Sequence, residues 1–169
     1  MVSGTQDSYS IHPLDVVEHV AIKQKWEFVR ESDNDNEINL AVEGLLRIYP
    51  VQILWFTQTE TLTLKSTIDM EPPLARLSEF YNLVNQCNRI IFRGKFEFLT
   101  DKKQIEWRSS LEVPNVKLLN PQKIYTLVTS SINTFDSFMP VFTTIAWSNY
   151  TVNQVIATYL KKRNRDKHE

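Results

Sequence analysis

The sequence predicts an α+β protein in which an antiparallel, meandering sheet of five or six strands carries helices packed on one face. Apolar residues recur at intervals of three and four in some segments, and they alternate with polar residues in others. The joints between alternating segments are short and polar, which favours hairpins over the crossovers of a parallel sheet. With 169 residues, 42% of them hydrophobic and 23% charged, the chain has the profile of one globular domain.

The N-terminal half is expected to contain one helix followed by three or four strands. Pro13 suits the first turn of a helix, and an apolar stripe continues at helical spacing to about Lys25. From Trp26 the apolar period changes to two, which predicts strands. These strands are expected over residues 26–28, 38–42, 51–55 and 62–70, joined by turns at 32–36, 44–49 and 57–60.

Pro72 and Pro73 are expected to end this run of strands and to precede a second helix. Gly94 follows that helix, where a left-handed cap is expected. The apolar stripe predicted for the helix consists of Leu74, Leu77, Tyr81, Val84, Cys87 and Ile91. A hairpin of two strands is then expected over residues 96–113, with its turn at 100–103.

Two helices are expected to complete the chain. Asn120 and Pro121 predict the start of a long helix, and Pro140 inside it predicts a kink. Thr151 is a suitable N-cap for a shorter last helix. The apolar stripe predicted for the long helix consists of Ile124, Val128, Ser131, Phe135, Phe138, Phe142 and Ile145.

Composition divides the chain into three parts. Residues 1–10 are polar and are expected to form a disordered leader, residues 11–160 the single α+β domain, and residues 161–169 a basic solvated tail. The tail holds five basic and two acidic residues, so the rest of the chain is net acidic. A net acidic body does not favour nucleic-acid binding, and an arm that contacts RNA or DNA is the alternative interpretation of the tail.

Cysteine usage and hydropathy indicate a cytoplasmic protein without a membrane anchor. Cys87 is the single cysteine, which excludes an intrachain disulfide and favours a reducing compartment. No apolar run reaches the length of a membrane span. Because Cys87 lies on a predicted apolar stripe, we interpret it as a packed core thiol, with a nucleophile as the alternative.

The residue patterns of common enzymatic chemistries are missing, so we expect no catalytic residue, metal or cofactor. Three glycines are too few for a phosphate-binding loop, and no nucleophile elbow occurs. His12 and His19 are seven residues apart, and surface roles are favoured over a shared metal ion. The acidic run 33–37 resembles the start of a calcium loop, but Ile38 occupies the glycine position, so a hairpin turn is expected.

The segment 51–56 is the one expected strand that is apolar on both faces. If Val51, Ile53 and Trp55 face the core, Leu54 and Phe56 point to the open face of the sheet. A helix end or a loop that covers this face is one interpretation. The other is a docking patch for a subunit or partner protein, with Leu54 and Phe56 as its candidate residues.

The chain contains, in this order, the motifs H-P-L-D-V-V at 12–17, W-E-F at 26–28, the stretch 79–85, G-K-F-E-F at 94–98, W-R at 107–108 and M-P-V-F at 139–142, leading to Trp147. In their order and spacing these motifs resemble those of the YbjN family, which is described as putative bacterial sensory transduction regulators. The resemblance covers about residues 12–160. The chain departs from relatives at Lys95, where they often have a histidine, and at Ser148 and Asn149, where they tend to have glycines.

The resemblance implies a fold like that of type III secretion chaperones, which often dimerise and bind extended protein segments. It implies no enzymatic activity, and no functional residue can be carried over to this chain. We therefore expect a non-enzymatic bacterial regulatory or chaperone-like module that binds an unidentified protein, with a homodimer among its expected assemblies. The alternative is a small-molecule sensor or enzyme with a pocket between the sheet and the long helix, opening at Pro140.

Overall fold

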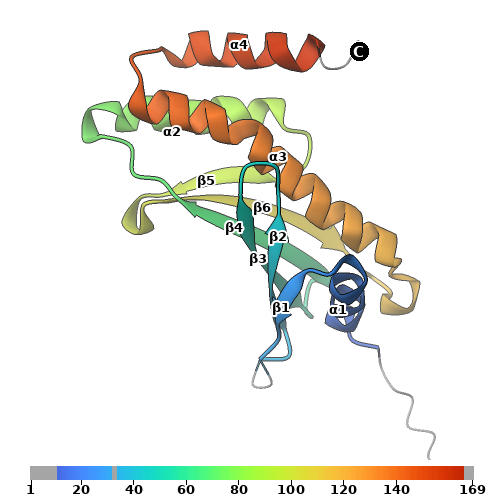
Figure 1. The fold of residues 1–169 in the computed structure, drawn as a ribbon. Coiled ribbons are helices and arrows are strands. Elements are labelled where there is room, and N and C mark those ends of the chain that lie inside the picture. The colour runs from blue at the N-terminus through green and yellow to red at the C-terminus, as the bar shows by residue number, and fades with distance from the viewer. Residues whose placement is uncertain (1–10, 32–33, 166–169) are drawn as a thin grey trace, which may run out of the picture.

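The computed structural model describes residues 11–31 and 34–165, and within them it contains six strands and four α-helices (Figure 1). The predicted leader, residues 1–10, and the last four residues of the predicted tail lie outside the described residues. The strands are β1 Glu27–Val29, β2 Glu37–Glu43, β3 Ile48–Phe56, β4 Thr61–Asp69, β5 Lys95–Leu99 and β6 Gln104–Glu112. The helices are α1 Pro13–Gln24, α2 Leu77–Ile90, α3 Pro121–Trp147 and α4 Val152–Arg165, with short 3-10 turns η1 Leu74–Arg76, η2 Thr100–Lys102 and η3 Val116–Leu118.

All six strands form one antiparallel sheet in the order β1-β2-β3-β4-β6-β5. The predicted α+β class and element order are confirmed. The register places Ile53 opposite Ile38 on one side and Leu64 on the other, so core side chains stand in line across the inner face. After β4 the chain passes through α2, and β6 rather than β5 then pairs with β4, which leaves β5 at the edge.

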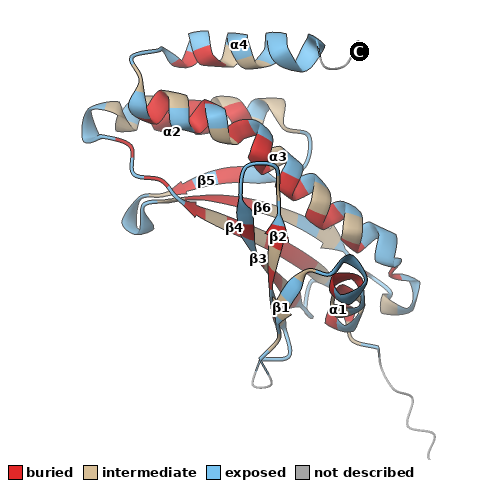
Figure 2. Cartoon of the chain, viewed as in Figure 1, coloured by how far each residue is buried: buried red, intermediate tan, exposed pale blue. Residues whose placement is uncertain are grey.

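The helices lie on one face of the sheet, as predicted, and the other face is open (Figure 1). α1 contacts β1 and β2, α2 contacts β5, and α3 contacts β6. α4 forms an outer layer that packs against α2 and α3. Figure 2 shows the result: buried positions follow the inner side of α3, whereas most of α4 is exposed.

Aromatic rings fill the space between α3 and the edge of the sheet. Phe96 of β5 is at the centre of this cluster, and the centroids of its neighbours lie 4.8 to 5.4 Å from its ring. These neighbours, all buried, are Trp107, Phe135, Phe138 and Phe142. Tilted and edge-to-face contacts between buried rings favour one arrangement of α3 on the sheet. Every position of the stripe predicted for α3 is buried.

The stripe predicted for α2 is partly wrong. Leu74 is 89% exposed because the residues after Pro73 form the 3-10 turn η1, so that α2 begins only at Leu77. Tyr81 is also exposed. The buried side chains of α2 are Phe80, Leu83, Val84 and Cys87. Val84 and Cys87 are buried as predicted, and Phe80 and Leu83 complete the buried face of the helix.

Gly94 has the predicted positive φ, 77°, but it does not cap α2. The helix ends at Ile90, its C-cap residue Ile91 is extended, and Gly94 lies in the loop before β5. A Cβ at this position would lie 2.4 Å from Cζ2 of Trp107 and 2.8 Å from the carbonyl oxygen of Arg108. Both the backbone conformation and the crowded space therefore require glycine.

The predicted starts of α3 and α4 are confirmed by their capping bonds. Asn120 Oδ1 accepts a hydrogen bond from the backbone N of Gln122 at 2.8 Å. Thr151 and Gln154 form a reciprocal capping box, with the backbone N of each donating to the side chain of the other. α3 remains helical through Pro140, and α4 continues through residues 161–165, which are exposed. No α-helix in the described ranges is both long and apolar enough to cross a membrane.

Candidate functional site

The turn between β2 and β3 is attached to α3 by the carboxylate of Asp136. Oδ2 of Asp136 accepts a hydrogen bond from the backbone N of Leu45 at 2.7 Å, and Oδ1 accepts one from the backbone N of Leu46 at 3.3 Å. The hydroxyl of Tyr49 donates to Oδ1 at 2.5 Å. These bonds join groups about 90 positions apart in the sequence and hold the turn against α3 (Figure 1).

Asp136 is almost completely buried, at 7% exposure, yet its carboxylate has three hydrogen-bond donors. A buried carboxylate without such partners would be strongly destabilising, and charge-assisted hydrogen bonds offset that cost. Burial, together with the hydrogen bond to Asp136 and its negative charge, raises the pKa of Tyr49 well above its usual value. The Tyr49 hydroxyl therefore stays protonated and remains a donor throughout the physiological pH range.

Gly44 allows the turn to approach α3 closely. A Cβ at Gly44 would lie 2.6 Å from Oδ2 of Asp136 and 2.6 Å from Cε2 of Tyr49. The backbone N of Gly44 donates to the carbonyl of Arg47 at 2.8 Å and closes the turn. Leu45 and Leu46 project from this fixed turn into solvent, with 91% and 59% of their surface exposed.

A groove of about 1150 Å³ lies beside the turn, between α3 and α4. It is present because α4 turns back over α3 after the short joint at 148–151 (Figure 1). Among its apolar lining residues are Leu45 and Leu46 of the turn, Pro140 and Val141 of α3, and Val155 and Ala157 of α4. We call this feature the α3–α4 groove.

The corner between α3 and α4 is fixed by Arg76, which lies just before α2. Its guanidinium donates to the carbonyl oxygens of Ile145 at 3.2 Å and Tyr150 at 2.7 Å. Further along α4, the ring of Tyr159 packs on that of Phe138, with 4.7 Å between the centroids. The groove therefore has two walls that are attached to the core and to each other.

Three cations lie at the part of the groove formed by the second half of α4: Lys161, Lys162 and Arg163, all of them exposed. Among the described residues that line the groove, Asp136 is the only carboxylate, and both of its oxygens already accept hydrogen bonds. No ion pair joins the three cations to another residue in the described part of the chain. The groove thus combines apolar walls with a positive rim.

Leu54 and Phe56, the candidate residues from the sequence, lie on the open face of the sheet. Leu54 is half-buried between Glu37 of β2 and Thr63 of β4. Phe56 pairs with Thr61 and is 46% exposed. The structure brings the two residues onto the same face, but polar neighbours keep this apolar patch small.

The large groove of the structure does not lie between the sheet and the long helix, where a pocket was expected. The aromatic cluster around Phe96 fills the space between α3 and the sheet, and the α3–α4 groove lies on the outer side of α3. Sequence reasoning missed this groove because its residues come from two consecutive helices and from a turn about 90 positions earlier in the chain. Asp136 could have indicated it, since this carboxylate interrupts the apolar stripe of α3 next to Phe135.

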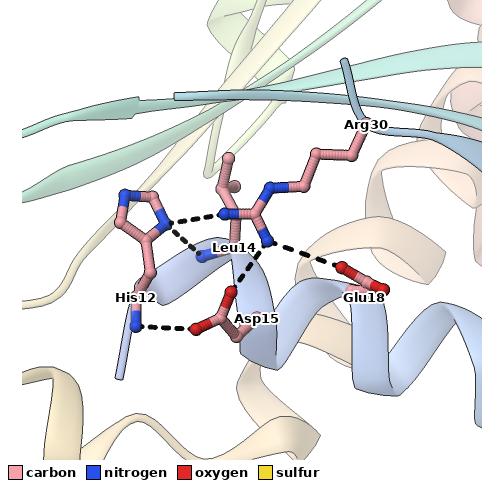
Figure 3. A network of polar contacts seen from close by, with 5 residues as sticks. All are labelled: His12, Leu14, Asp15, Glu18 and Arg30. Atoms are coloured by element: carbon pink, nitrogen blue, oxygen red, sulfur yellow. Dashed lines mark hydrogen bonds and ion pairs between the residues drawn. The ribbon is translucent and has the colours of Figure 1, made fainter. Parts of the chain in front are cut away.

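A second polar network joins α1 to the residue after β1 (Figure 3). Arg30 donates to Asp15 at 2.7 Å and to Glu18 at 3.4 Å, and it lies 3.5 Å from Nδ1 of His12. His12 and Asp15 cap α1, since Leu14 N donates to His12 Nδ1 at 3.2 Å and His12 N donates to Asp15 at 2.9 Å. Partial burial acts to raise the pKa of Asp15, but the hydrogen bonds and positive charge of Arg30 outweigh it and lower that pKa.

The histidines, the acidic run and Cys87, which the sequence offered as further candidates, occupy capping, surface, turn and core positions. His12 is used for capping and His19 is exposed, and no group of three or more potential metal ligands is present among the residues that the structure describes. In the segment that resembles a calcium loop, Asn36 N donates to Asn34 Oδ1 within a turn, while Asp33 lies outside the described residues. Cys87 is fully buried, and burial raises the pKa of its thiol to about 12, as expected of a core thiol.

These features define an α+β domain with a one-sided helical layer and an open apolar groove. A sequence model of the family described as "YbjN: Putative bacterial sensory transduction regulator" matches residues 13–144. The chain therefore belongs to the YbjN family, as its motifs predict. No curated protein matches the chain.

Among solved structures, the chain is similar to the crystal structure of YbjN, a putative transcription regulator from E. coli. The TM-score is 0.52 at 14% sequence identity, and the similarity covers 74% of this chain and 88% of the other. At this identity the similarity supports the fold. α4 follows the segment that the family model matches, so one wall of the groove lies outside the match.

Proposed function

We propose that this chain is a cytoplasmic, non-enzymatic regulatory or chaperone-like adaptor that binds a segment of another protein in the α3–α4 groove. The observation that carries this proposal is the pair of exposed leucines, Leu45 and Leu46, on a turn that buried hydrogen bonds hold beside the groove. Large apolar side chains gathered beside a groove are typical of interaction surfaces. A function in regulation agrees with the description of the YbjN family.

The rigidity of the turn supports binding. Asp136 fixes the backbone at both Leu45 and Leu46, so the turn itself need not be ordered when a partner arrives. Binding costs free energy for the ordering of loops and side chains at the interface, and a turn whose backbone is already fixed avoids the loop part of this cost. The same hydrogen bonds that stabilise the fold therefore also prepare the surface.

The open shape of the groove favours a protein segment over a metabolite. Pockets for small molecules usually have volumes of about 300–1,000 Å³ and enclose most of the ligand. The α3–α4 groove has about 1150 Å³ and lies open along two helices. The small-molecule sensor therefore remains the second candidate, and a metabolite that raises the melting temperature of the protein would favour it.

The open sheet face around Leu54 and Phe56 is a second surface, proposed for a homodimer. Its apolar area is small and polar side chains border it, so it supports a partner less strongly than the groove does. Sedimentation of the wild type and the Phe56→Lys variant tests it. A dimer that the substitution dissociates is expected if this face is the dimer interface.

The adaptor proposal is tested by capture of a partner from native lysate with tagged protein. The first variant is Leu45→Ser combined with Leu46→Ser, and the matched control is Leu118→Ser, which removes another exposed leucine from η3. We expect a stoichiometric partner that the control retains and the double variant loses. Capture that is unchanged in the double variant would show that the groove is not the binding surface.

A further inference from the structure

We propose that the occupant of the α3–α4 groove is an acidic amphipathic helix of a partner protein. This inference rests on the proposed function and names the chemistry of the segment that the groove takes. Two features of the groove carry it: the elements that form its walls and the sign of the charges on its rim.

The walls of the groove favour a helix over an extended strand. Its lining comes from the β2–β3 turn, from α3 and from α4 with the joint before it, so it offers no strand edge to which an extended segment could add. A helix satisfies its own backbone hydrogen bonds and needs only side-chain contacts, so it can lie between α3 and α4. Leu45, Leu46 and Val141 would contact its apolar face.

One edge strand of the sheet, β5, is blocked to strand addition at Phe96. At the edge strand β5, the side chain of Asn88 donates to the carbonyl oxygen of Phe96 at 2.9 Å and accepts from its backbone N at 2.8 Å. These contacts occupy both backbone groups that a further strand would pair with at this position. Recognition through side chains in the groove is therefore better supported than recognition by extension of the sheet at β5.

The rim of the groove selects for negative charge. Lys161, Lys162 and Arg163 contribute three positive charges, whereas the one carboxylate in the described lining, Asp136, is buried and already bonded. Charges at the rim of an interface mainly determine which partners are rejected and how the association depends on salt. A helix with acidic residues beside its apolar face complements both parts of the groove.

A library of helix-forming peptides of about 16 residues, roughly four helical turns, displayed on phage and selected on the full chain, provides the probe. We expect selected sequences to be acidic and to carry apolar residues three and four positions apart. Fluorescence anisotropy of a selected peptide then compares the wild type with the charge-reversal variant Lys161→Glu, Lys162→Glu and Arg163→Glu. The matched control reverses three exposed lysines away from the groove: Lys102→Glu, Lys117→Glu and Lys123→Glu.

We expect the charge reversal in the groove to lower the affinity for the peptide by roughly tenfold or more, and this difference to become smaller at high salt. The control variant should bind the peptide as the wild type does. Because Lys161, Lys162 and Arg163 are exposed, circular dichroism should show the same fold in all variants. Selection of neutral or basic peptides would overturn the proposed chemistry. Equal affinity of the reversal variant and the wild type would also overturn it.

The Leu45→Ser, Leu46→Ser variant separates the two proposals. If it abolishes binding while the charge reversal has no effect, the groove is the docking site but the partner is not acidic. If neither variant has an effect, the proposed function fails as well. The last measurement uses a single-stranded RNA oligonucleotide of mixed sequence. If this RNA binds more tightly than the peptide and the charge reversal abolishes its binding, the proposal of a helical protein partner is wrong and nucleic acid is the ligand.

Discussion

Two polar clusters hold distant parts of this chain together, and they differ in burial. The Asp136 cluster joins the β2–β3 turn to α3, and its carboxylate is only 7% exposed. The Arg30 cluster joins α1 to the residue after β1, and the side chains of Asp15 and Glu18 are 51% and 38% exposed (Figure 3). Similar hydrogen bonds therefore operate in very different surroundings.

The difference teaches what each cluster contributes. In the Arg30 cluster the two carboxylates remain accessible to water, although the Arg30 side chain is only 18% exposed, and exposed ion pairs contribute only about 0–1 kcal/mol. In the buried cluster water cannot replace a lost partner. Loss of one group therefore leaves the other donors or acceptors without a hydrogen bond, at a cost to stability of about 1–3 kcal/mol each. We expect the Asp136 cluster to determine the stability and the shape of the groove, and the Arg30 cluster to make a smaller, pH-dependent contribution.

The strongest test of the comparison is Asp136→Leu. This change removes the acceptor for Leu45 N, Leu46 N and the Tyr49 hydroxyl, so we expect the free energy of unfolding to fall by about 3 kcal/mol. Urea titration measures it, with Asp101→Leu as an exposed control. A loss below about 1 kcal/mol, the range of exposed pairs, would contradict the importance given to burial.

The second test removes a single donor from the buried cluster. Tyr49→Phe keeps the ring but deletes the hydroxyl that donates to Asp136, and we expect a loss of about 1.5 kcal/mol, as for hydrogen bonds to a charged group. Tyr125→Phe, at a half-buried ring stacked on Trp26, is the matched control. Equal unfolding midpoints for the two variants would show that the Tyr49 hydroxyl contributes nothing to stability.

The exposed cluster should respond more weakly. Arg30→Met removes the contacts with Asp15, Glu18 and His12 while keeping an apolar stem, and we expect a loss of about 0.5–1 kcal/mol. High salt should reduce the difference from the wild type, because salt screens exposed charges. Arg93→Met, at an exposed position, serves as the control. If Arg30→Met lowered the free energy of unfolding as much as Asp136→Leu, burial would not explain the difference between the two clusters.

The smallest effect concerns pH. The pKa of Asp15 is lowered in the folded state, so its carboxylate stabilises the fold above its unfolded pKa, about 3.9, and this contribution is lost as pH falls through the folded value. Asp15→Asn should therefore cost a few tenths of a kcal/mol at neutral pH, as for other exposed pairs, and nothing in strong acid. Stability curves of both proteins between neutral and strongly acidic pH measure it. A difference that persists unchanged in acid would contradict this role of the ionised carboxylate.

Much of the fold was predictable because it depends on local patterns. The buried stripe of α3, the caps at Asn120 and Thr151 and the strands from β2 to β4 follow from spacing and capping chemistry. The exposure of Leu74 was missed because the 3-10 turn after Pro73 delays the start of α2. The order of β5 and β6 at the sheet edge was not predictable either, since it depends on where α2 returns the chain.

The candidate site was less predictable than the fold. The sequence indicated Leu54 and Phe56 from the alternation within one strand, and the structure places both on the open face. It did not indicate the α3–α4 groove, although Asp136 within an apolar stripe was a signal of a buried polar cluster. A groove made by a turn and two helices has no pattern within any single segment.

By itself the sequence determined the α+β class, the family, the single buried thiol and the face that each strand presents to the core. These depend on the period of apolar residues and on short motifs, which are properties of neighbouring residues. Only the tertiary structure decided that Asp136 meets Leu45, Leu46 and Tyr49, and that α4 folds back over α3 beside them. Contacts between groups about 90 positions apart depend on how the whole core packs, and so they leave no local pattern in the chain.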